Sequence, residues 1–193
     1  MRDLKYLFAY SIPLSTFCSI YFHGMWSYSS VFYAFVIIPL LEWRLKQPNT
    51  IYSDQEIEGR LKNKLFDFML YFNVPIVFGL LSYGLLTLHQ DVFATYERVG
   101  ILSSLGILLA TNAINVAHEL GHRLSRFERT LSKLLYMPCL YMHFFLEHNY
   151  GHHKNLATSD DPATARYNQP LYSFWISSVI NQYKNAWRIQ FRL

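Results

Sequence analysis

The sequence predicts an all-α integral membrane protein, and three observations support this prediction. Hydrophobic residues make up 52% of the 193 residues and charged residues only 16%, whereas an average soluble domain has ~25% charged residues. Four uncharged stretches approach or reach the ~20 apolar residues that a helix needs to cross a bilayer. The lysines and arginines fall almost entirely in segments that would share one side of the membrane.

The four uncharged stretches are expected to form transmembrane helices near residues 6–22, 26–41, 68–90 and 99–117. His23 and Gly24 mark a tight connection between the first two. Pro48 and Asn49 are turn signals in the charged segment after the second. A histidine-rich region, residues 118–166, follows the fourth span.

The distribution of basic residues predicts the orientation in the membrane. If the N-terminus is cytoplasmic, Arg98 is the one of the 17 basic residues that faces the opposite side. Basic residues concentrate on the cytoplasmic side, so we expect an integral membrane protein whose histidines face the cytoplasm. The same bias explains the net charge of +4, because basic segments attract anionic membrane lipid. A nucleic acid partner is not expected.

Two histidine clusters, which we call the first and second boxes, indicate a metal site. The first is His118–His122 and the second is Glu147–His153. Each contains two histidines four residues apart, a spacing that places both imidazoles on one face of an α-helix. Imidazole is a common ligand of transition metals. The predicted metal ligands are His118, His122, His148, His152 and His153.

Carboxylates beside the boxes are interpreted as groups that hold the imidazoles rather than the metal. These are Glu119, Glu147 and Asp161. Catalytic zinc takes three protein ligands, so five histidines suit two metal ions better than one. The remaining histidines His23, His89 and His143 are interpreted mainly as packing residues.

The segment from Arg129 to Glu147 is apolar enough to suggest a fifth span, but Lys133 and Pro138 interrupt it. A fifth crossing would also place the two boxes on opposite sides of the membrane, where they could share no metal. We therefore expect an interfacial or re-entrant helix bent near Pro138. Residues 171–187 are predicted to form a similar amphipathic helix, with the start of a further span as the alternative.

The segment from Asn112 to Arg166 resembles the bacterial integral-membrane alkane 1-monooxygenases, within the membrane fatty acid desaturase and hydroxylase superfamily. The first box reads HELGHR, and the second reads HFFLEHNYGHH followed by KNLATSDDPATAR. The glutamate that opens the second box and the Ala-Thr-x-x-Asp-Pro-Ala run after it are the features that resemble the alkane hydroxylases in particular.

This resemblance implies a non-haem diiron centre that uses O2 to hydroxylate the terminal carbon of an alkane or a related alkyl chain. It implies rubredoxin and rubredoxin reductase as electron donors and a substrate taken from the bilayer. By position, the five histidines of the two boxes would be iron ligands.

One feature departs from the family pattern. The family has a further lone histidine and a third box of the His-x-x-His-His kind, whereas no histidine follows His153. We therefore expect the N-terminal portion of a longer enzyme, cut before the third box, with weak or absent activity on its own.

Other functions stay open from the sequence. The substrate class includes a fatty acyl chain or a xylene-like aromatic methyl group. A membrane fatty acid desaturase would use the same metals, and an inactive membrane fragment would use none. The first box also matches the HExxH pattern of zinc proteases, in which Glu119 would be the general base.

Overall fold

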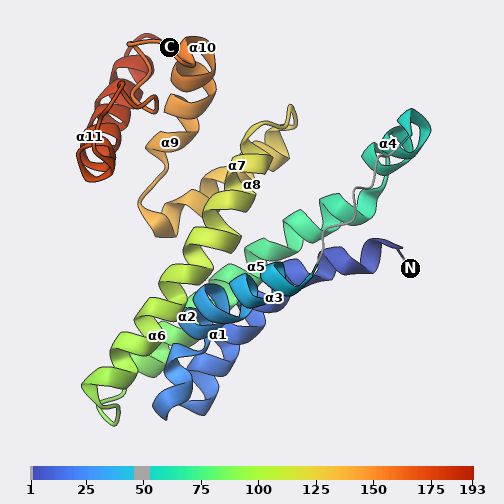
Figure 1. Ribbon diagram of the computed structural model, residues 1–193, viewed down its shortest axis with the longest axis vertical. Helices are drawn as coiled ribbons and strands as arrows, with labels where there is room; N and C mark the ends of the chain where they lie inside the picture. The colour runs from blue at the N-terminus through green and yellow to red at the C-terminus, as the bar shows by residue number, and fades with distance from the viewer. Residues whose placement is uncertain (1, 46–52) are drawn as a thin grey trace. The chain divides into compact units, whose positions relative to one another are not determined.

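The computed structural model describes residues 2–45 and 53–193 (Figure 1). These residues form α-, 3-10 and π-helices and no strand, which confirms the predicted all-α fold. The chain divides into two compact units, Met1–Val116 and Ala117–Leu193, and each is described by itself. The turn predicted at Pro48 and Asn49 lies outside the described residues.

The described residues of unit 1 form ten helical elements. They are η1 (Arg2–Tyr10), α1 (Ser11–Phe22), η2 (Gly24–Tyr28), α2 (Ser29–Phe32), η3 (Tyr33–Ile37), α3 (Ile38–Arg44), α4 (Asp54–Leu61), α5 (Lys64–Leu88), α6 (Thr95–Leu108) and η4 (Leu109–Ile114). Polar side chains cap the starts of α4 and α5. The Ser53 hydroxyl accepts the Glu56 N–H at the start of α4, and the Glu56 carboxylate accepts the Ser53 N–H in return.

Three helices within the described ranges are long and apolar enough to cross a membrane: Gly24–Arg44, Lys64–Leu88 and Thr95–Gly121. They correspond to the second, third and fourth predicted spans, with shifted ends, and they support the predicted integral membrane fold. The first predicted span, 6–22, is helical but is not among the three. It combines the 3-10 helix η1 with the short helix α1, and its crossing of the membrane stays a prediction.

The core of unit 1 lies between α1 and α6. Ile20 of α1 packs against Ile101, Leu105 and Leu108 of α6, and all four are buried. Gly100 permits the close approach of η2, because a Cβ at this position would lie 2.3 Å from the Ser27 hydroxyl. Elsewhere, large apolar side chains of unit 1 are exposed, as is typical of a surface that faces lipid.

Two buried asparagines connect α5 to η4. The Asn112 amide donates to Asn73 Oδ1 at 2.9 Å and to the Ala9 carbonyl at 3.2 Å, while the Asn73 amide donates to the Met69 carbonyl. Hydrogen bonds of this kind hold helices together where no water competes.

Unit 2 carries both histidine boxes. Its helices are α7 (Asn115–Gly121), α8 (Arg126–Tyr136), η5 (Met137–Cys139), α9 (His143–Leu146), η6 (Glu147–His152), α10 (His153–Asn155) and α11 (Leu171–Gln190). The chain turns after α8: Pro138 lies in the 3-10 helix η5, and Leu140 has a φ of 52°. This break agrees with the bend that the sequence predicts near Pro138.

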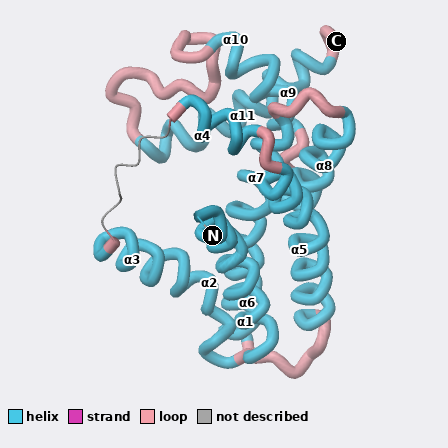
Figure 2. Tube along the Cα trace, turned by 90° about the vertical axis from the view of Figure 1, so that its right-hand side faces the viewer, coloured by secondary structure: helices cyan, strands magenta, loops and turns pink. Residues whose placement is uncertain are grey.

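Helix α11 packs beside the second box. It packs against α9 and η6, and the loop drawn in pink in Figure 2 joins it to α10. Its buried residues Ser178, Gln182 and Ala186 recur at helical spacing, and Gln182 accepts a hydrogen bond from Tyr141 at 3.5 Å. This is the amphipathic helix that the sequence predicts, and it is not among the candidate spans of the described chain.

Candidate metal centre

The first box lies where α7 ends. His118 is inside the helix, and His122 directly follows Gly121, the last helical residue. The His122 N–H donates to the Glu119 carbonyl, which continues the turn and brings the two Nε2 atoms to 3.2 Å. The Ser132 hydroxyl of α8 donates to the Ala117 carbonyl at 2.6 Å and so fixes the backbone beside the box.

Residues Glu147–His152 of the second box form the π-helix η6, in which backbone hydrogen bonds join residues five apart instead of four, and His153 begins α10. This changes which histidines face one another. His148 and His153 are five residues apart, and their Nε2 atoms lie 3.1 Å from each other. The His152 ring stacks beside His148 with a centroid separation of 5.3 Å, while its Nδ1 faces Asp161.

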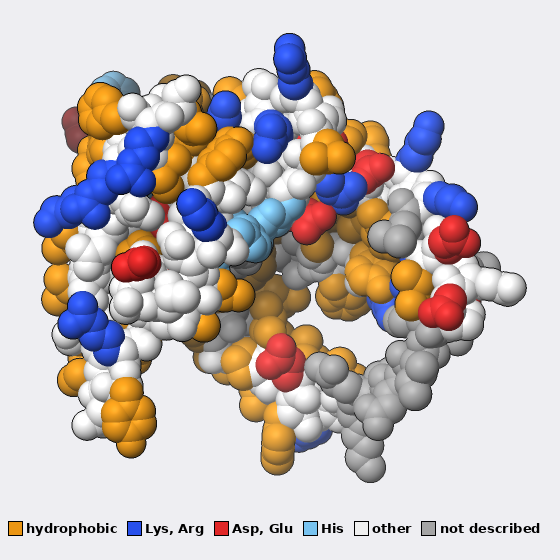
Figure 3. All heavy atoms as spheres, turned by 90° about the horizontal axis from the view of Figure 1, so that it is seen from above, with side chains coloured by type: hydrophobic (Ala, Val, Ile, Leu, Met, Phe, Trp, Pro, Cys, Tyr) orange, Lys and Arg blue, Asp and Glu red, His pale blue; other side chains and the backbone are white. Residues whose placement is uncertain are grey.

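The two boxes converge on one point. His148 Nε2 lies 2.6 Å from His118 Nε2 and 3.2 Å from His122 Nε2, in addition to its contact with His153. We call these four imidazoles the histidine cluster: His118, His122, His148 and His153. His122 and His153 are exposed, and Figure 3 shows histidine side chains at the surface of the face drawn.

The geometry of the cluster fits a metal ion. A neutral imidazole has one N–H donor and one lone pair, so three Nε2 atoms within 3.2 Å of one another cannot all be paired by hydrogen bonds. Bond lengths of ~2.1 Å place neighbouring nitrogen ligands about 3.0 to 3.4 Å apart. The separations of 3.1 and 3.2 Å lie in this range, and the 2.6 Å between His118 and His148 is shorter.

The electrostatics of the cluster keep His148 neutral. Burial lowers its pKa first, and the neighbouring histidines add to the effect, so that the pKa is about 3. At neutral pH the imidazole is therefore uncharged and offers a lone pair, which is the form that binds metals.

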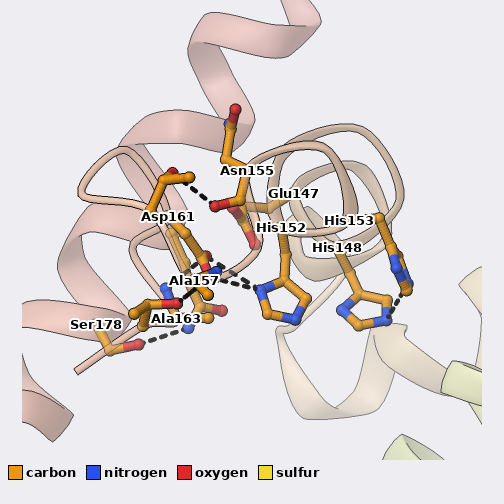
Figure 4. Close-up of polar contacts among 12 residues, drawn as sticks. Glu147, His148, His152, His153, Asn155, Ala157, Asp161, Ala163 and Ser178 are labelled. Carbon is orange, nitrogen blue, oxygen red and sulfur yellow. Dashed lines mark hydrogen bonds and ion pairs between the residues drawn. The ribbon is translucent and has the colours of Figure 1, made fainter.

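Asp161 holds the fifth predicted ligand. Its carboxylate is 3% exposed and lies 3.0 and 3.1 Å from His152 Nδ1 (Figure 4). It also accepts hydrogen bonds from the Ala163 N–H and the Thr164 hydroxyl. Burial alone would raise the Asp161 pKa, but these hydrogen bonds together outweigh burial and lower it. Because Asp161 accepts from Nδ1, Nε2 is the nitrogen that His152 can offer to a metal.

Glu147 is fully buried and turns toward α11. Its Oε1 accepts from the Asn185 amide at 3.3 Å, while its Oε2 has no partner among the described residues. Burial raises its pKa, and the Asn185 contact opposes this only in part. Sequence patterns did not single out Asn185. The signal for it was weak: one amide on the inner face of an amphipathic helix.

Glu119 lies differently from the other two carboxylates. It is half exposed and forms an ion pair with Arg123 at 3.1 Å. This pair occupies one of its oxygens with a surface arginine instead of an imidazole. A role for Glu119 in holding a histidine stays a prediction.

The three histidines outside the two boxes are His23, His89 and His143. His143 lines an apolar pocket of about 520 Å³ with Leu146 and Tyr183, and its buried Nε2 lacks a partner in the described chain. His23 packs against Phe93. Both fit the predicted packing role. His89 is exposed, so its interpretation as a packing residue was wrong.

Sequence comparisons agree with this arrangement. Residues 94–193, which include both boxes and α11, match the model of the fatty acid desaturase family. The chain belongs to the fatty acid desaturase family. This confirms the superfamily expected from the two boxes.

Several relatives with named activities are 26–30% identical to this chain. Alkane 1-monooxygenase 1 of Alcanivorax borkumensis is 30% identical over 83% of this chain and 41% of its own length. An alkane 1-monooxygenase of Pseudomonas putida is 30% identical over 80% of this chain and 38% of its own length. The xylene/toluene monooxygenase hydroxylase component of Pseudomonas putida is 26% identical over 98% of this chain and 50% of its own length.

This member of the fatty acid desaturase family therefore spans about two fifths of the length of the alkane monooxygenases that it matches. Residues 94–193, which match the family model, contain every residue of the histidine cluster.

Proposed function

We propose that this chain supplies histidine ligands to a non-haem iron centre in a membrane monooxygenase that hydroxylates alkanes or related alkyl chains. The observation that carries the proposal is the convergence of three Nε2 atoms from the two boxes, those of His118, His122 and His148, with separations of 2.6 to 3.2 Å. His153 Nε2 lies beside this group, 3.1 Å from His148 Nε2. The similarity to alkane 1-monooxygenases supports the choice of reaction.

The residues present have distinct tasks in this proposal. The histidine cluster would hold an iron ion, and His152, oriented by Asp161, would hold a second. Bound iron supplies the reduction and activation of O2 that insertion of one oxygen atom into a C–H bond requires. The chain itself keeps the imidazoles neutral by burial, as at His148, and fixes the tautomer of His152.

The substrate and the electron donor follow from the same proposal. Exposed apolar side chains such as Phe35 and Trp43, which are 72% and 78% exposed, suit a lipid environment. A water-insoluble alkyl chain is best collected from that environment. We propose that rubredoxin delivers the electrons and that the histidines face the cytoplasm of a bacterial inner membrane, as the placement of all basic residues except Arg98 suggests.

Two other activities predict different observations. A membrane desaturase with the same metals would convert an alkyl chain to an alkene, so the product distinguishes it from a hydroxylase. A zinc protease of the HExxH kind needs Glu119 as a general base beside the metal. The ion pair of Glu119 with Arg123 does not favour that role.

Metal analysis of the purified chain tests the iron centre. We expect iron that is retained by the wild-type chain and lost from the His118→Ala and His148→Ala variants. Zinc in its place, or iron that is independent of both histidines, would contradict the proposal. For the reaction, membranes that contain the protein are supplied with octane, O2, rubredoxin and its reductase. The expected product is 1-octanol, formed at most weakly by residues 1–193 alone, and an alkene product would favour the desaturase.

A further inference from the structure

The buried carboxyl of Glu147 lies between η6 and α11 and contacts α11 at one place. Its side chain is 0% exposed, and Oε1 accepts the Asn185 amide at 3.3 Å. Its second oxygen has no partner within the described residues. A buried carboxyl that lacks partners is costly, so the Asn185 contact is a strong constraint on where this side chain can lie.

Gly151 makes this contact possible. A Cβ at Gly151 would lie 2.6 Å from Glu147 Oε1 and 2.8 Å from Asn185 Nδ2. The carboxyl and the amide therefore meet directly over the bare Cα of Gly151. Any larger residue at this position would push the two groups apart.

The contact lies inside the turn that carries the ligands. Glu147 and Gly151 both belong to the π-helix η6, which runs Glu147–His152. The π-helical register pairs His148 with His153 in the cluster and turns His152 toward Asp161. π-Turns of this kind are rare and frequently occur at functional sites.

We propose that Asn185 is a positioning residue for the metal centre. By donating to Glu147 over Gly151, it fixes the π-turn and so the direction in which His148 and His153 point. This inference rests on the proposed function for its consequence, the iron centre. Its structural part, the effect of Asn185 on the two imidazoles, stands without bound metal.

Three variants separate the hydrogen bond from simple packing. Asn185→Leu keeps the size of the side chain and removes the amide donor. Asn185→Gln is larger and keeps the donor. Asn181→Leu is the matched control, because Asn181 is an exposed asparagine one turn earlier on α11. If Asn185 only fills space, Leu should be tolerated and Gln should not.

The first measurement uses the metal-free chain in detergent micelles. The ¹⁵N NMR signals of the histidine rings are assigned with single His→Gln variants, and circular dichroism checks helix content. We expect Asn185→Leu to shift the signals of His148 and His153, while Asn185→Gln and Asn181→Leu keep the wild-type signals. Unchanged signals in Asn185→Leu would overturn the proposal, as would a disturbed Gln variant beside an undisturbed Leu variant.

The second measurement is a Co²⁺ titration of the same proteins, followed by the visible absorption of the bound ion. We expect Asn185→Leu to weaken Co²⁺ binding roughly 10–100-fold, the usual effect of losing an outer-shell partner, and to change the absorption spectrum. If the wild-type chain bound no Co²⁺, the proposed function would be contradicted, and the metal-free NMR comparison would still decide the role of Asn185.

A variant that fails to fold is covered by a further substitution. Asn185→Ala also removes the amide, adds no bulk and favours helix. If Asn185→Leu loses helix content, Asn185→Ala replaces it in both measurements. Wild-type histidine signals in Asn185→Ala would then overturn the proposal.

Discussion

The first box ends the regular α-helix α7, whereas the second box forms the π-helix η6, although both contain two histidines four residues apart. In the first box the two histidines four residues apart both belong to the cluster, with Nε2 atoms at 3.2 Å. In the second box the cluster takes His148 and His153, which are five residues apart. His152 is left to face Asp161.

This difference shows that the sequence spacing of two histidines does not by itself determine whether their side chains meet. The backbone conformation between them decides it. The first box is held by the bond from the His122 N–H to the Glu119 carbonyl and by the Ser132 hydroxyl of α8, which donates to the Ala117 carbonyl. The π-turn of the second box is accompanied by a buried carboxyl, a bare glycine and an amide from α11. The second box should therefore be the more sensitive of the two to changes outside its histidines.

The largest effect is expected at His148, where the boxes meet. Its Nε2 lies within 3.2 Å of three other Nε2 atoms, so His148→Ala removes the link between the first box and His153. We expect metal binding to weaken by more than the roughly 10–100-fold cost of losing an outer-shell partner. Isothermal titration with Co²⁺ measures this.

The matched control for this prediction is His89→Ala, because His89 is an exposed histidine in unit 1. It should leave Co²⁺ binding unchanged. Equal losses in the two variants would show that the cluster is not the metal site.

The second effect is expected at Asp161, which acts only on the second box. Asp161→Asn replaces the carboxylate that accepts from His152 Nδ1 and frees that ring to turn. We expect metal affinity to fall by roughly 10–100-fold. Asp160→Asn is the control, since Asp160 is the exposed neighbour and carries the same charge. Equal affinity in Asp161→Asn and wild type would remove His152 from the metal centre.

The two box glycines test the comparison directly. A Cβ at Gly151 would lie 2.6 Å from Glu147 Oε1, whereas a Cβ at Gly121 would lie 3.2 Å from the Ser132 hydroxyl. We expect Gly151→Ala to lower the free energy of unfolding by about 1–3 kcal/mol, as overpacking in a filled interior does. Gly121→Ala should cost less. Urea unfolding of both variants measures the difference, and a larger loss in Gly121→Ala would reverse the comparison.

The sequence was sufficient for the helical fold and for the presence of both boxes, because uncharged stretches and histidine clusters are local signals. It did not predict the π-turn of η6. The spacing of His148 and His152 is the same as that of His118 and His122, so nothing within the box distinguishes the two. The distinguishing contact comes from Asn185, which lies 38 positions after Glu147 and forms its contact only when α11 packs against η6.

The first predicted span illustrates a second limit of the sequence. Residues 6–22 carry no charge, but they include several serines and Pro13. In the structure they form the end of a 3-10 helix followed by the 12-residue α1. Absence of charge is a weaker signal than continuous apolar character. In unit 1, buried Thr16 and Ser19 of α1 donate hydrogen bonds to backbone carbonyls within the same helix. Because these hydroxyls are paired inside the helix, they can be buried. The sequence alone does not show which serines and threonines are paired in this way.

The smallest effect is expected at Glu119, the carboxylate of the first box. Its partner is Arg123 at 3.1 Å, and both side chains are more than a third exposed, so Glu119→Gln breaks only a surface ion pair. Pairs of this kind at i,i+4 contribute about 0.3–0.5 kcal/mol, and we expect a loss of unfolding free energy of that size with no change in Co²⁺ affinity. Urea unfolding and a Co²⁺ titration check both quantities. A loss of metal binding as large as that of Asp161→Asn would show that Glu119 holds an imidazole, as Asp161 does, and would make the two boxes alike. Loss of a proteolytic activity in Glu119→Gln would instead favour the HExxH zinc protease, because the general base of that mechanism is this glutamate.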